Sequence, residues 1–371
     1  MASRPSPAAA AVSPSAKSAS ASPVRSPVRG PAAANDGPES TVNAAIAVDP
    51  QVEYEGWSEA DTESLRTSST ASLSESITEY RRILGRTYTQ KVDYCVPNDE
   101  KQNEALDVAH YWETLFLDDR LYLAPLPKNP DRVLDVGTGT GIWAIDFADE
   151  FASSEVTGVD ISPIQPSWVP PNCKFQIDNV EELWTWPEEY FDFIHIRHLE
   201  AAISDWPKLY DQAFRHLAPG GFIEVKELDI EDHSQALGDL PDTHIYKRWA
   251  KVTYEATQKI GKPLTHVYGI ANELRAAGFV DVVEHCWRIP VGAWPADPKM
   301  REVGAVNLEY VDQALEGFGY FLFKEVMGWE DVEIMVFIAE MRKALRDIKL
   351  QTFFKLHLIH GRKPEAEASS A

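Results

Sequence analysis

Apolar runs alternate with amphipathic stretches along most of this chain, and the alternation predicts its fold class. Residues 103–117 have the apolar spacing of an amphipathic helix. Five apolar runs of strand length follow, separated by stretches of helical spacing, at 132–136, 156–160, 174–177, 191–197 and 221–228. Strands separated by helices form parallel sheets with helices on both faces, so we expect an α/β, doubly wound sheet. Its ligands would bind at the carboxyl ends of the strands.

The C-terminal third continues the alternation but is richer in helical spacing. The pattern predicts helices at 243–260, 270–277, 298–326 and 330–348, and strands at 280–287 and 353–361. We therefore expect one α/β domain at 126–364 with helical additions at both ends. The N-terminal addition is a helical cap at 76–125, and 365–371 is a short unstructured tail.

The first 75 residues lack such periodicity. Residues 1–40 contain 11 Ala, 9 Ser and 7 Pro, and the chain then becomes acidic and rich in Ser and Thr. A segment of this composition cannot bury enough apolar surface to order itself, so we expect 1–75 to be disordered. The sequence "SPVR" occurs twice, at 22–25 and 26–29. The repeat could provide proline-directed phosphorylation sites, or it could be accidental in a solvated tail.

Composition and charge exclude several classes of protein. The chain has 58 acidic and 35 basic residues, a formal net charge of -23, which would repel nucleic-acid phosphates. Its three cysteines, Cys95, Cys173 and Cys286, show no metal-ligand spacing and are typical of a reducing compartment. No apolar stretch has membrane-spanning length or follows a secretory pattern. We expect a cytoplasmic or nuclear protein without a metal site, a membrane span or direct nucleic-acid binding.

A glycine turn stands between the first predicted strand and its helix, in "RVLDVGTGTGIWAIDFADEF" (132–151). A glycine turn that opens a helix lets backbone N–H groups approach a polar ligand. Gly137, Gly139 and Gly141 form G-x-G-x-G, whereas the dinucleotide fingerprint G-x-G-x-x-G would need glycine at Ile142. The dinucleotide interpretation therefore fails at one residue.

Carboxylates at the ends of the next two strands narrow the choice of ligand. Asp160 ends the second strand, where a carboxylate would accept hydrogen bonds from ribose hydroxyls. Asp178 closes the third strand, where it could accept from an exocyclic amine. Each could instead be an ordinary helix cap. Together with the glycine turn and "LAPGGFIEV" at 217–225, however, the four features are hard to explain as separate caps.

Longer motifs carry a resemblance to a known family. The stretches "VLDVGTGTGIWAIDFADEF" and "VTGVDISPIQPSWVPPNC" resemble the class I S-adenosylmethionine-dependent methyltransferases, and more narrowly the fungal LaeA-like methyltransferases of secondary metabolism. The resemblance covers roughly Ser68 to Pro364 and implies a Rossmann-like, seven-stranded methyltransferase sheet with S-adenosylmethionine as cofactor. Thr89 stands where such proteins often have His, and Gln351 and Phe353 stand where His and Tyr are expected. These departures put the substrate of this chain in doubt.

The resemblance also implies roles for the cofactor-binding residues. At the methionine end, Asp135 and the backbone of Gly137 would hold the amino acid, and Gly139 and Gly141 would allow close approach. At the nucleoside end, Asp160 would bind the ribose hydroxyls and Ile161 would pack on the adenine face. Asp178 would accept a hydrogen bond from the adenine amine, and Asn179 would lie beside it.

Catalysis is harder to predict, because methyl transfer needs in-line placement and needs a base only if the nucleophile carries a proton. Arg197, His198 and Glu227 fall at the expected active-site edge. His198 or Glu227 could be the base, or each could be a structural polar contact. Arg197 cannot lose its proton but could grip the carboxylate of an acidic acceptor. Alternatively, it forms an ion pair with Asp205, Glu200 or another acid and only braces the loop.

Other chemically notable residues have ordinary structural interpretations. His110 lies on an apolar helix face, where a histidine satisfied within the core is commoner than a catalyst. Six tryptophans are expected mainly in the core, although several could line a pocket for an aromatic metabolite: Trp184, Trp186, Trp206, Trp249, Trp294 and Trp329.

Three functions remain open. The first is an enzyme that methylates a small molecule at oxygen, nitrogen or carboxylate. The second is a nuclear regulator of LaeA type that acts in a protein complex, with a protein or itself as acceptor. The third is a non-catalytic scaffold, which the intact cofactor residues argue against. The Ser/Pro-rich tail favours protein partners and regulation, while the lack of a basic localisation cluster favours the enzyme, which we prefer.

Overall fold

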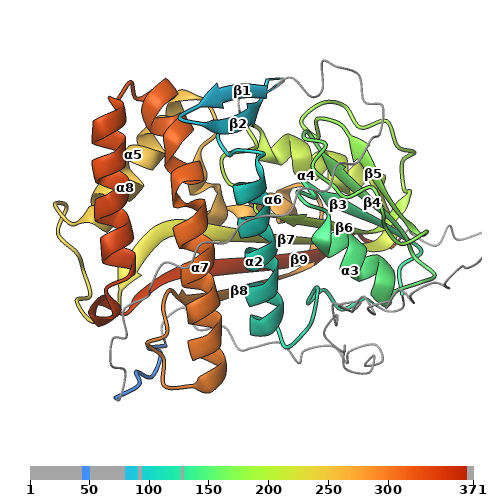
Figure 1. The fold of residues 1–371 in the computed structure, drawn as a ribbon. Helices are drawn as coiled ribbons and strands as arrows, with labels where there is room; N and C mark the ends of the chain where they lie inside the picture. The colour runs from blue at the N-terminus through green and yellow to red at the C-terminus, as the bar shows by residue number, and fades with distance from the viewer. Residues whose placement is uncertain (1–43, 51–79, 91–93, 127–128, 366–371) are drawn as a thin grey trace, which may run out of the picture. The chain divides into compact units, whose positions relative to one another are not determined.

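The computed structural model describes residues 44–50, 80–90, 94–126 and 129–365. Its centre is a seven-stranded sheet in the order β5-β4-β3-β6-β7-β9-β8 (Figure 1). Five strands run parallel: β3 (Arg132–Val136), β4 (Glu155–Asp160), β5 (Cys173–Ile177), β6 (Phe191–Arg197) and β7 (Leu217–Ser234). The strand order reverses between β3 and β6, which is where doubly wound sheets open a ligand site at their carboxyl edge. The predicted α/β class is confirmed.

One strand departs from the parallel arrangement. β9 (Thr352–Arg362) lies between β7 and β8 (Val280–Pro290) and is antiparallel to both. The start of β9, Thr352, pairs with the end of β7, Ser234. The chain therefore enters β9 from the carboxyl edge of the sheet, after the C-terminal helices, and has to run back.

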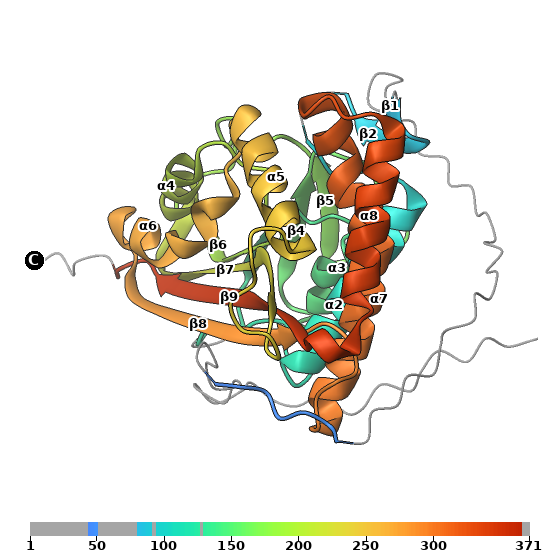
Figure 2. The ribbon, with the colours of Figure 1, turned by 90° about the vertical axis from the view of Figure 1, so that its left-hand side faces the viewer.

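Helices cover both faces of the sheet. α2 (Glu100–Phe116), α3 (Ile142–Glu150) and α7 (Pro298–Phe321) lie on one face, and α4 (Trp206–His216) and α6 (Ile270–Ala276) lie on the other (Figures 1 and 2). α5 (Ile245–Lys259) and α8 (Asp331–Leu345) extend the layer beyond the end of β7. Each helix predicted with bounds is present, and the stretch predicted as one helix at 298–326 ends in a π-helical turn, Leu322–Val326. The helical stretches expected between β4 and β5 and between β5 and β6 are wrong, because 161–172 and 178–190 form turns and loops.

The predicted helical cap at 76–125 is wrong at its start. β1 (Tyr80–Ile83) and β2 (Arg86–Thr89) form an antiparallel hairpin, and α2 follows. The two turn residues, Leu84 and Gly85, both have positive φ, 48° and 84°, as tight hairpins require. A leucine in the first turn position gives no hairpin signal in the sequence, which explains the error.

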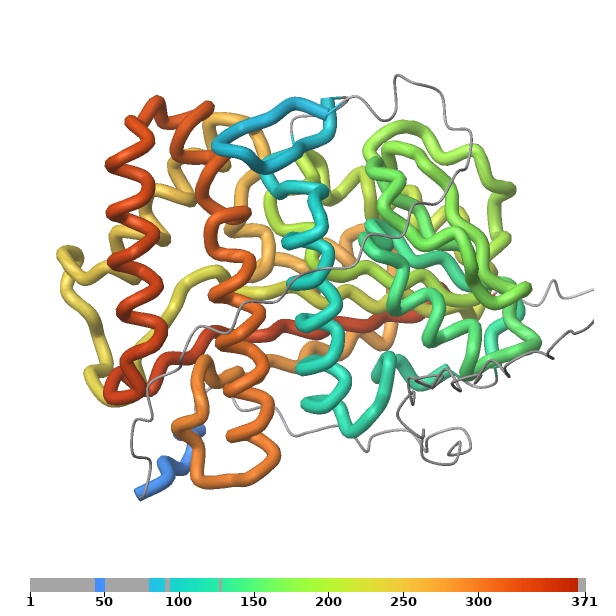
Figure 3. The backbone as a smooth tube through the Cα atoms, in the orientation of Figure 1, coloured from blue at the N-terminus to red at the C-terminus, as the bar shows by residue number. Residues whose placement is uncertain are grey.

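A short segment from the expected tail also has a defined place. Asp49 N donates to Trp294 O at 2.9 Å, and Ala296 N donates to Ala47 O at 2.7 Å. Figure 3 shows 44–50 beside the loop that leads into α7. This pairing corrects the expectation of disorder for 44–50, whose backbone donors and acceptors find partners that composition cannot reveal. The remainder of 1–75, with its "SPVR" repeat, and the tail beyond residue 365 lie outside the described residues.

Candidate functional site

A cleft lies at the carboxyl edge of the sheet, over the ends of β3, β4, β5 and β6. It contains about 1050 Å³ of empty space, part of which is open to solvent. Eight of the eleven site residues predicted from the sequence line it: Gly137, Gly139, Asp160, Ile161, Asp178, Asn179, Arg197 and His198. Asp135, Gly141 and Glu227 are not among its lining residues.

The glycine turn shapes the floor of the cleft. Gly137 and Gly139 line it with φ of 69° and 58°. Gly141, with φ of 82°, begins α3, and a Cβ there would lie 2.3 Å from Cζ of Phe175. Gly141 therefore lets α3 pack against β5, and close approach to a ligand falls to Gly137 and Gly139.

Asp160 joins the glycine turn to the end of β4. Its Oδ2 accepts a hydrogen bond from Gly139 N, and its Oδ1 accepts one from Ser162 N, both at 2.9 Å. Burial raises the pKa of Asp160 to about 6, although these backbone hydrogen bonds oppose the rise. A carboxylate has about four acceptor sites, and three backbone donors use three of them, so Asp160 can take a further donor from the cleft.

The end of β5 lies beside Asp160. Asp178 N donates to Asp160 O at 2.9 Å, which holds the two strand ends together. The Asp178 side chain is exposed, and its Oδ1 accepts from Asn179 N at 2.9 Å. The two carboxylates therefore lie along one wall of the cleft, with Ile161 as an apolar lining residue between them in sequence.

Asp135 is placed differently from the expectation. It is buried below the turn, where His195 Nδ1 lies 2.8 Å from its Oδ1 and Thr138 Oγ1 donates to its Oδ2 at 2.6 Å. Burial lowers the pKa of His195 to about 4, so the ring is neutral and donates its Nδ1 hydrogen to the carboxylate. His195 also stacks on Trp143, with ring centroids 3.7 Å apart. Asp135 thus links β3 to β6 and to the glycine turn. The role of His195 was not predicted from the sequence, in which it is a polar residue between two isoleucines of β6.

A buried charge cluster lies next to the cleft, centred on Glu113 of α2. Its Oε2 is 2.6 Å from Lys226 Nζ and 3.1 Å from Arg197 Nη1, and its Oε1 contacts His198 Nε2. These cations hold the pKa of Glu113 well below its usual value against the effect of burial. Sequence analysis missed Glu113 and Lys226, although a carboxylate on the apolar face of a helix is itself a signal of a buried partner.

This cluster changes the roles expected for the three catalytic candidates. Arg197 Nη1 donates to Glu113 and lies 3.1 Å from His110 Nδ1, so Arg197 has an ion-pair partner, which is neither Asp205 nor Glu200. His198 has Glu113 on one side and Glu200 Oε1 3.6 Å from its Nδ1. Despite burial, these carboxylates raise the pKa of His198 to about 9. A protonated imidazole cannot accept a proton, so His198 is unsuited to act as a base at neutral pH.

Glu227 is also unsuited to that role. It is buried, and its Oε1 accepts from Leu199 N at 3.1 Å. Burial and the neighbouring Glu200 raise its pKa well above the usual range. The raised pKa favours the protonated carboxyl, which cannot accept a proton, so Glu227 supports the loop that follows β6. His110, predicted as a satisfied core histidine, lies 3.0 Å from Asp146 Oδ2 through its Nε2 and is buried.

A second cavity, of about 1000 Å³, adjoins the cleft. The two share the lining residues Tyr94, Val96, Leu106 and His198. Trp249, one of the tryptophans considered for a pocket, lines this second cavity. Among the described residues no cluster of three or more His, Cys, Asp or Glu side chains is arranged to hold a metal ion. No helix in the described ranges is both long enough and apolar enough to span a membrane.

Comparisons with known proteins agree with this geometry. The family described as "Methyltransferase domain" matches residues 80–285. The chain is 37% identical over 300 residues to "Methyltransferase pytC" of Aspergillus terreus, covering 80% of this chain and 92% of the relative. It is 32% identical over 278 residues to "Secondary metabolism regulator LAE1" of Cochliobolus heterostrophus, covering 73% and 90%. It is 30% identical over 285 residues to "Protein-methionine methyltransferase laeA" of Emericella nidulans, covering 76% and 75%.

Among solved structures, the chain is similar to phosphoethanolamine N-methyltransferase 2 of Haemonchus contortus in complex with S-adenosyl-L-methionine. The identity is 19% and the TM-score 0.43, over 75% of this chain and 62% of that one. The matched family and the pytC and LaeA relatives confirm the resemblance predicted from the sequence. The chain therefore belongs to the methyltransferase domain family, as a relative of fungal methyltransferases and regulators of secondary metabolism.

Proposed function

We propose that this chain transfers a methyl group from S-adenosylmethionine, bound in the cleft, to a small molecule of fungal secondary metabolism. The cofactor follows from the methyltransferase family to which the chain belongs. The cleft, in which acids from two strand ends and two glycines of the turn converge, is the observation that carries the proposal. The three buried cysteines, Cys95, Cys173 and Cys286, support action in the cytoplasm or nucleus.

The residues of the cleft fit the cofactor chemically. Asp160 offers a free acceptor site to the ribose hydroxyls, and Asp178 offers one to the adenine amine. Ile161 supplies an apolar surface for the adenine ring, and the backbones of Gly137 and Gly139 leave room for the methionine portion. When bound, the cofactor supplies a methyl group on a positively charged sulfur.

Proton transfer would fall to a residue that the sequence did not indicate. The pKa of His198, raised to about 9, keeps its ring protonated at neutral pH, and the raised pKa of Glu227 favours its protonated form. Glu200 lines the second cavity beside His198. Its Oε1 accepts a hydrogen bond from Leu228 N at 2.6 Å, which fixes the position of the carboxylate. Glu200 is therefore our candidate to receive a proton from an acceptor hydroxyl or amine. The remaining contribution of the protein is to hold the acceptor in line with the methyl group.

A regulator of LaeA type is the second candidate. It is supported by the 30% and 32% identities to relatives that are named as a protein-methionine methyltransferase and a secondary metabolism regulator. Such a protein would act in a complex, and its partners could bind through the N-terminal tail. The second cavity, with its buried apolar walls, favours the small-molecule acceptor instead.

Calorimetric titration with S-adenosylmethionine and with NAD tests the cofactor site. We expect the first to bind and Asp160→Ala to weaken it by about 10- to 100-fold, because charge-assisted hydrogen bonds are worth about 1.5–3 kcal/mol. Glu340→Ala, which removes an exposed carboxylate paired with Arg248, is the matched control and leaves the affinity unchanged. Binding of NAD alone, or an unchanged affinity in Asp160→Ala, contradicts the assignment.

Methyl-labelled S-adenosylmethionine separates the two functions. The enzyme passes the label to a low-molecular-weight product when supplied with extracted fungal metabolites. Label that accumulates on the chain itself, with none in the small-molecule fraction, favours the regulator.

A further inference from the structure

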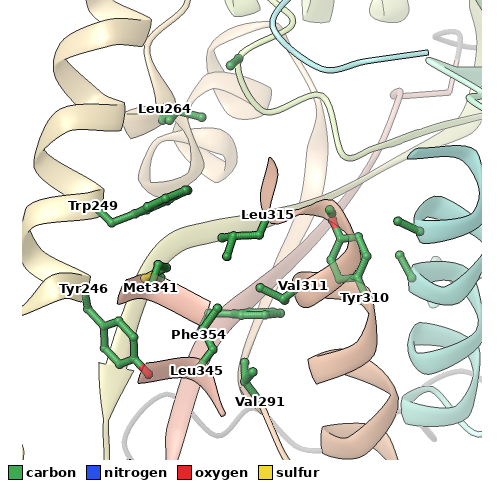
Figure 4. Close-up of a cluster of buried hydrophobic side chains, with 14 of the residues drawn as sticks. Tyr246, Trp249, Leu264, Val291, Tyr310, Val311, Leu315, Met341, Leu345 and Phe354 are labelled. Atoms are coloured by element: carbon green, nitrogen blue, oxygen red, sulfur yellow. The ribbon is translucent and has the colours of Figure 1, made fainter. Parts of the chain in front are cut away.

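The second cavity is lined mainly by apolar side chains that come from distant parts of the chain. Figure 4 shows several of them turned toward a common space between α5, α7, α8 and β9. Each of these lining residues is buried: Trp249, Leu264, Tyr310, Val311, Leu315 and Phe354. The space includes a part open to solvent, and walls of this kind suit an apolar small molecule.

Two buried polar residues, Thr253 and Asp232, stand among the apolar walls, and one of them lacks a hydrogen-bond partner in the described part of the chain. Thr253 is 7% exposed, and its Oγ1 has no hydrogen-bond partner among the described residues. Asp232 is 8% exposed and lines the same cavity. An unpaired buried hydroxyl is costly, so a ligand group that bonds to it would be favoured.

The charges around the cavity are unfavourable for an anion. Its described lining includes the carboxyl groups of Glu200, Asp229 and Asp232, and no lysine or arginine. The cation in that lining, the protonated His198, is already held between Glu113 and Glu200. Although burial opposes it, hydrogen bonds from His233 and Tyr268 lower the pKa of Asp229 to about 2, so Asp229 is charged at neutral pH. A ligand carboxylate would lose its hydration here and meet a like charge.

We infer that this cavity is the methyl-acceptor site and that it takes an uncharged, largely apolar small molecule whose polar group meets Thr253 and Asp232. The inference rests on the proposed function and names its substrate class. It replaces the acidic acceptor considered from the sequence, because Arg197 lines the cleft and is paired with Glu113. The accepting atom would lie near His198, which borders both spaces.

Two fluorescent probes test the charge selectivity on the full chain. N-phenyl-1-naphthylamine and 1-anilinonaphthalene-8-sulfonate share one ring skeleton, and the second adds a sulfonate. We expect the uncharged probe to bind saturably and at least tenfold more tightly than the anionic one. Saturating S-adenosylmethionine leaves the uncharged probe bound, because the cofactor occupies the cleft. Equal affinities, or displacement by the cofactor, overturn the inference.

Variants then locate the probe. Leu315→Trp fills the cavity and reduces the affinity for the uncharged probe at least tenfold, while cofactor affinity and melting temperature are retained. If that variant does not fold, Val311→Phe reduces the same space by less. Val336→Trp is the control for dye binding elsewhere on the surface. Val336 is 62% exposed on α8, where it forms an exposed apolar surface with Val332 and Met335 that could also bind a dye.

Each outcome separates the inference from the proposed function. Loss of probe binding in the cavity variant and not in Val336→Trp supports the inference, and the reverse pattern overturns it. A chain that binds no S-adenosylmethionine refutes the proposed function. A chain that binds the cofactor but shows no saturable binding of the uncharged probe refutes the acceptor site alone.

Discussion

The cleft that we propose for the cofactor and the second cavity adjoin each other, yet they are encoded in different ways. Most of the cleft comes from four successive strand ends and the turns after them, between Gly137 and Ile203. The cavity draws its walls from residues as far apart as Tyr94 and Phe354, on helices and strands that meet only in the folded chain. The first kind of site leaves a motif in the sequence, and the second leaves only an apolar pattern that any core would share.

The difference also concerns how much each region tolerates change. Backbone groups and strand-end carboxylates form the cleft, so single side chains there affect binding more than folding. Core side chains form the cavity, so a change of volume affects both.

Glu113→Gln should be the most damaging change, because Glu113 lies where the two regions meet. It leaves Lys226 and Arg197 buried without their carboxylate, and breaking a buried ion pair costs about 3–5 kcal/mol. Denaturant unfolding measures the loss. Glu340→Gln, in the exposed pair with Arg248, should change the stability by less than about 1 kcal/mol. Similar losses of unfolding free energy in Glu113→Gln and Glu340→Gln would show that the charge cluster around Glu113 does not hold the cleft and the second cavity together.

Gly304→Ala should destabilise the cavity region. Gly304 lies in α7, and a Cβ there would be 2.2 Å from the backbone oxygen of Gly292. Alanine usually stabilises a helix, but here α7 must shift, at a cost of about 1–3 kcal/mol. Thermal melting measures this, and Glu302→Ala, exposed on the same helix, is the control. A more stable Gly304→Ala would mean that α7 is loosely held and that the cavity is easily reshaped.

The segment 44–50 should stabilise the cavity side of the molecule and not the cleft. It pairs with 294–296, and Asp49 forms a 2.5 Å ion pair with Arg301 at the start of α7. A chain that begins at residue 51 should be less stable by about 1–2 kcal/mol than one that begins at residue 44. Its affinity for S-adenosylmethionine should stay within about twofold. Equal melting temperatures would show that the pairing of 44–50 adds no stability.

The pH dependence of cofactor binding should report on the cleft alone. Asp160, with its pKa raised to about 6 by burial, accepts ribose hydroxyls best when ionised. Affinity is therefore retained above that pKa and lost as the pH falls through it, by about fourfold between pH 7.5 and 5.5. Titrations at several pH values measure this, and Asp160→Asn should flatten the profile. A profile that stays steep in Asp160→Asn would assign the titration to another group.

Local sequence determined the sheet, most helices and the wall of the cleft. Gly137, Gly139, Asp160 and Asp178 each stand at a strand end, and the topology of parallel strands brings strand ends to one edge. Their neighbourhood therefore follows from periodicity alone. The hairpin of β1 and β2 was missed because its turn, with Leu84, lacks the usual residues.

Only the tertiary structure decided the chemical roles at the centre of the site. Glu113 lies 84 residues before Arg197 and 113 before Lys226, and no spacing links them. That buried carboxylate gives His198 its raised pKa and Arg197 its partner. Protonation depends on burial and on charges a few ångströms away, and both are set by packing between distant elements. The same packing encloses the second cavity, which is why the sequence identifies a methyltransferase and leaves its acceptor to the fold.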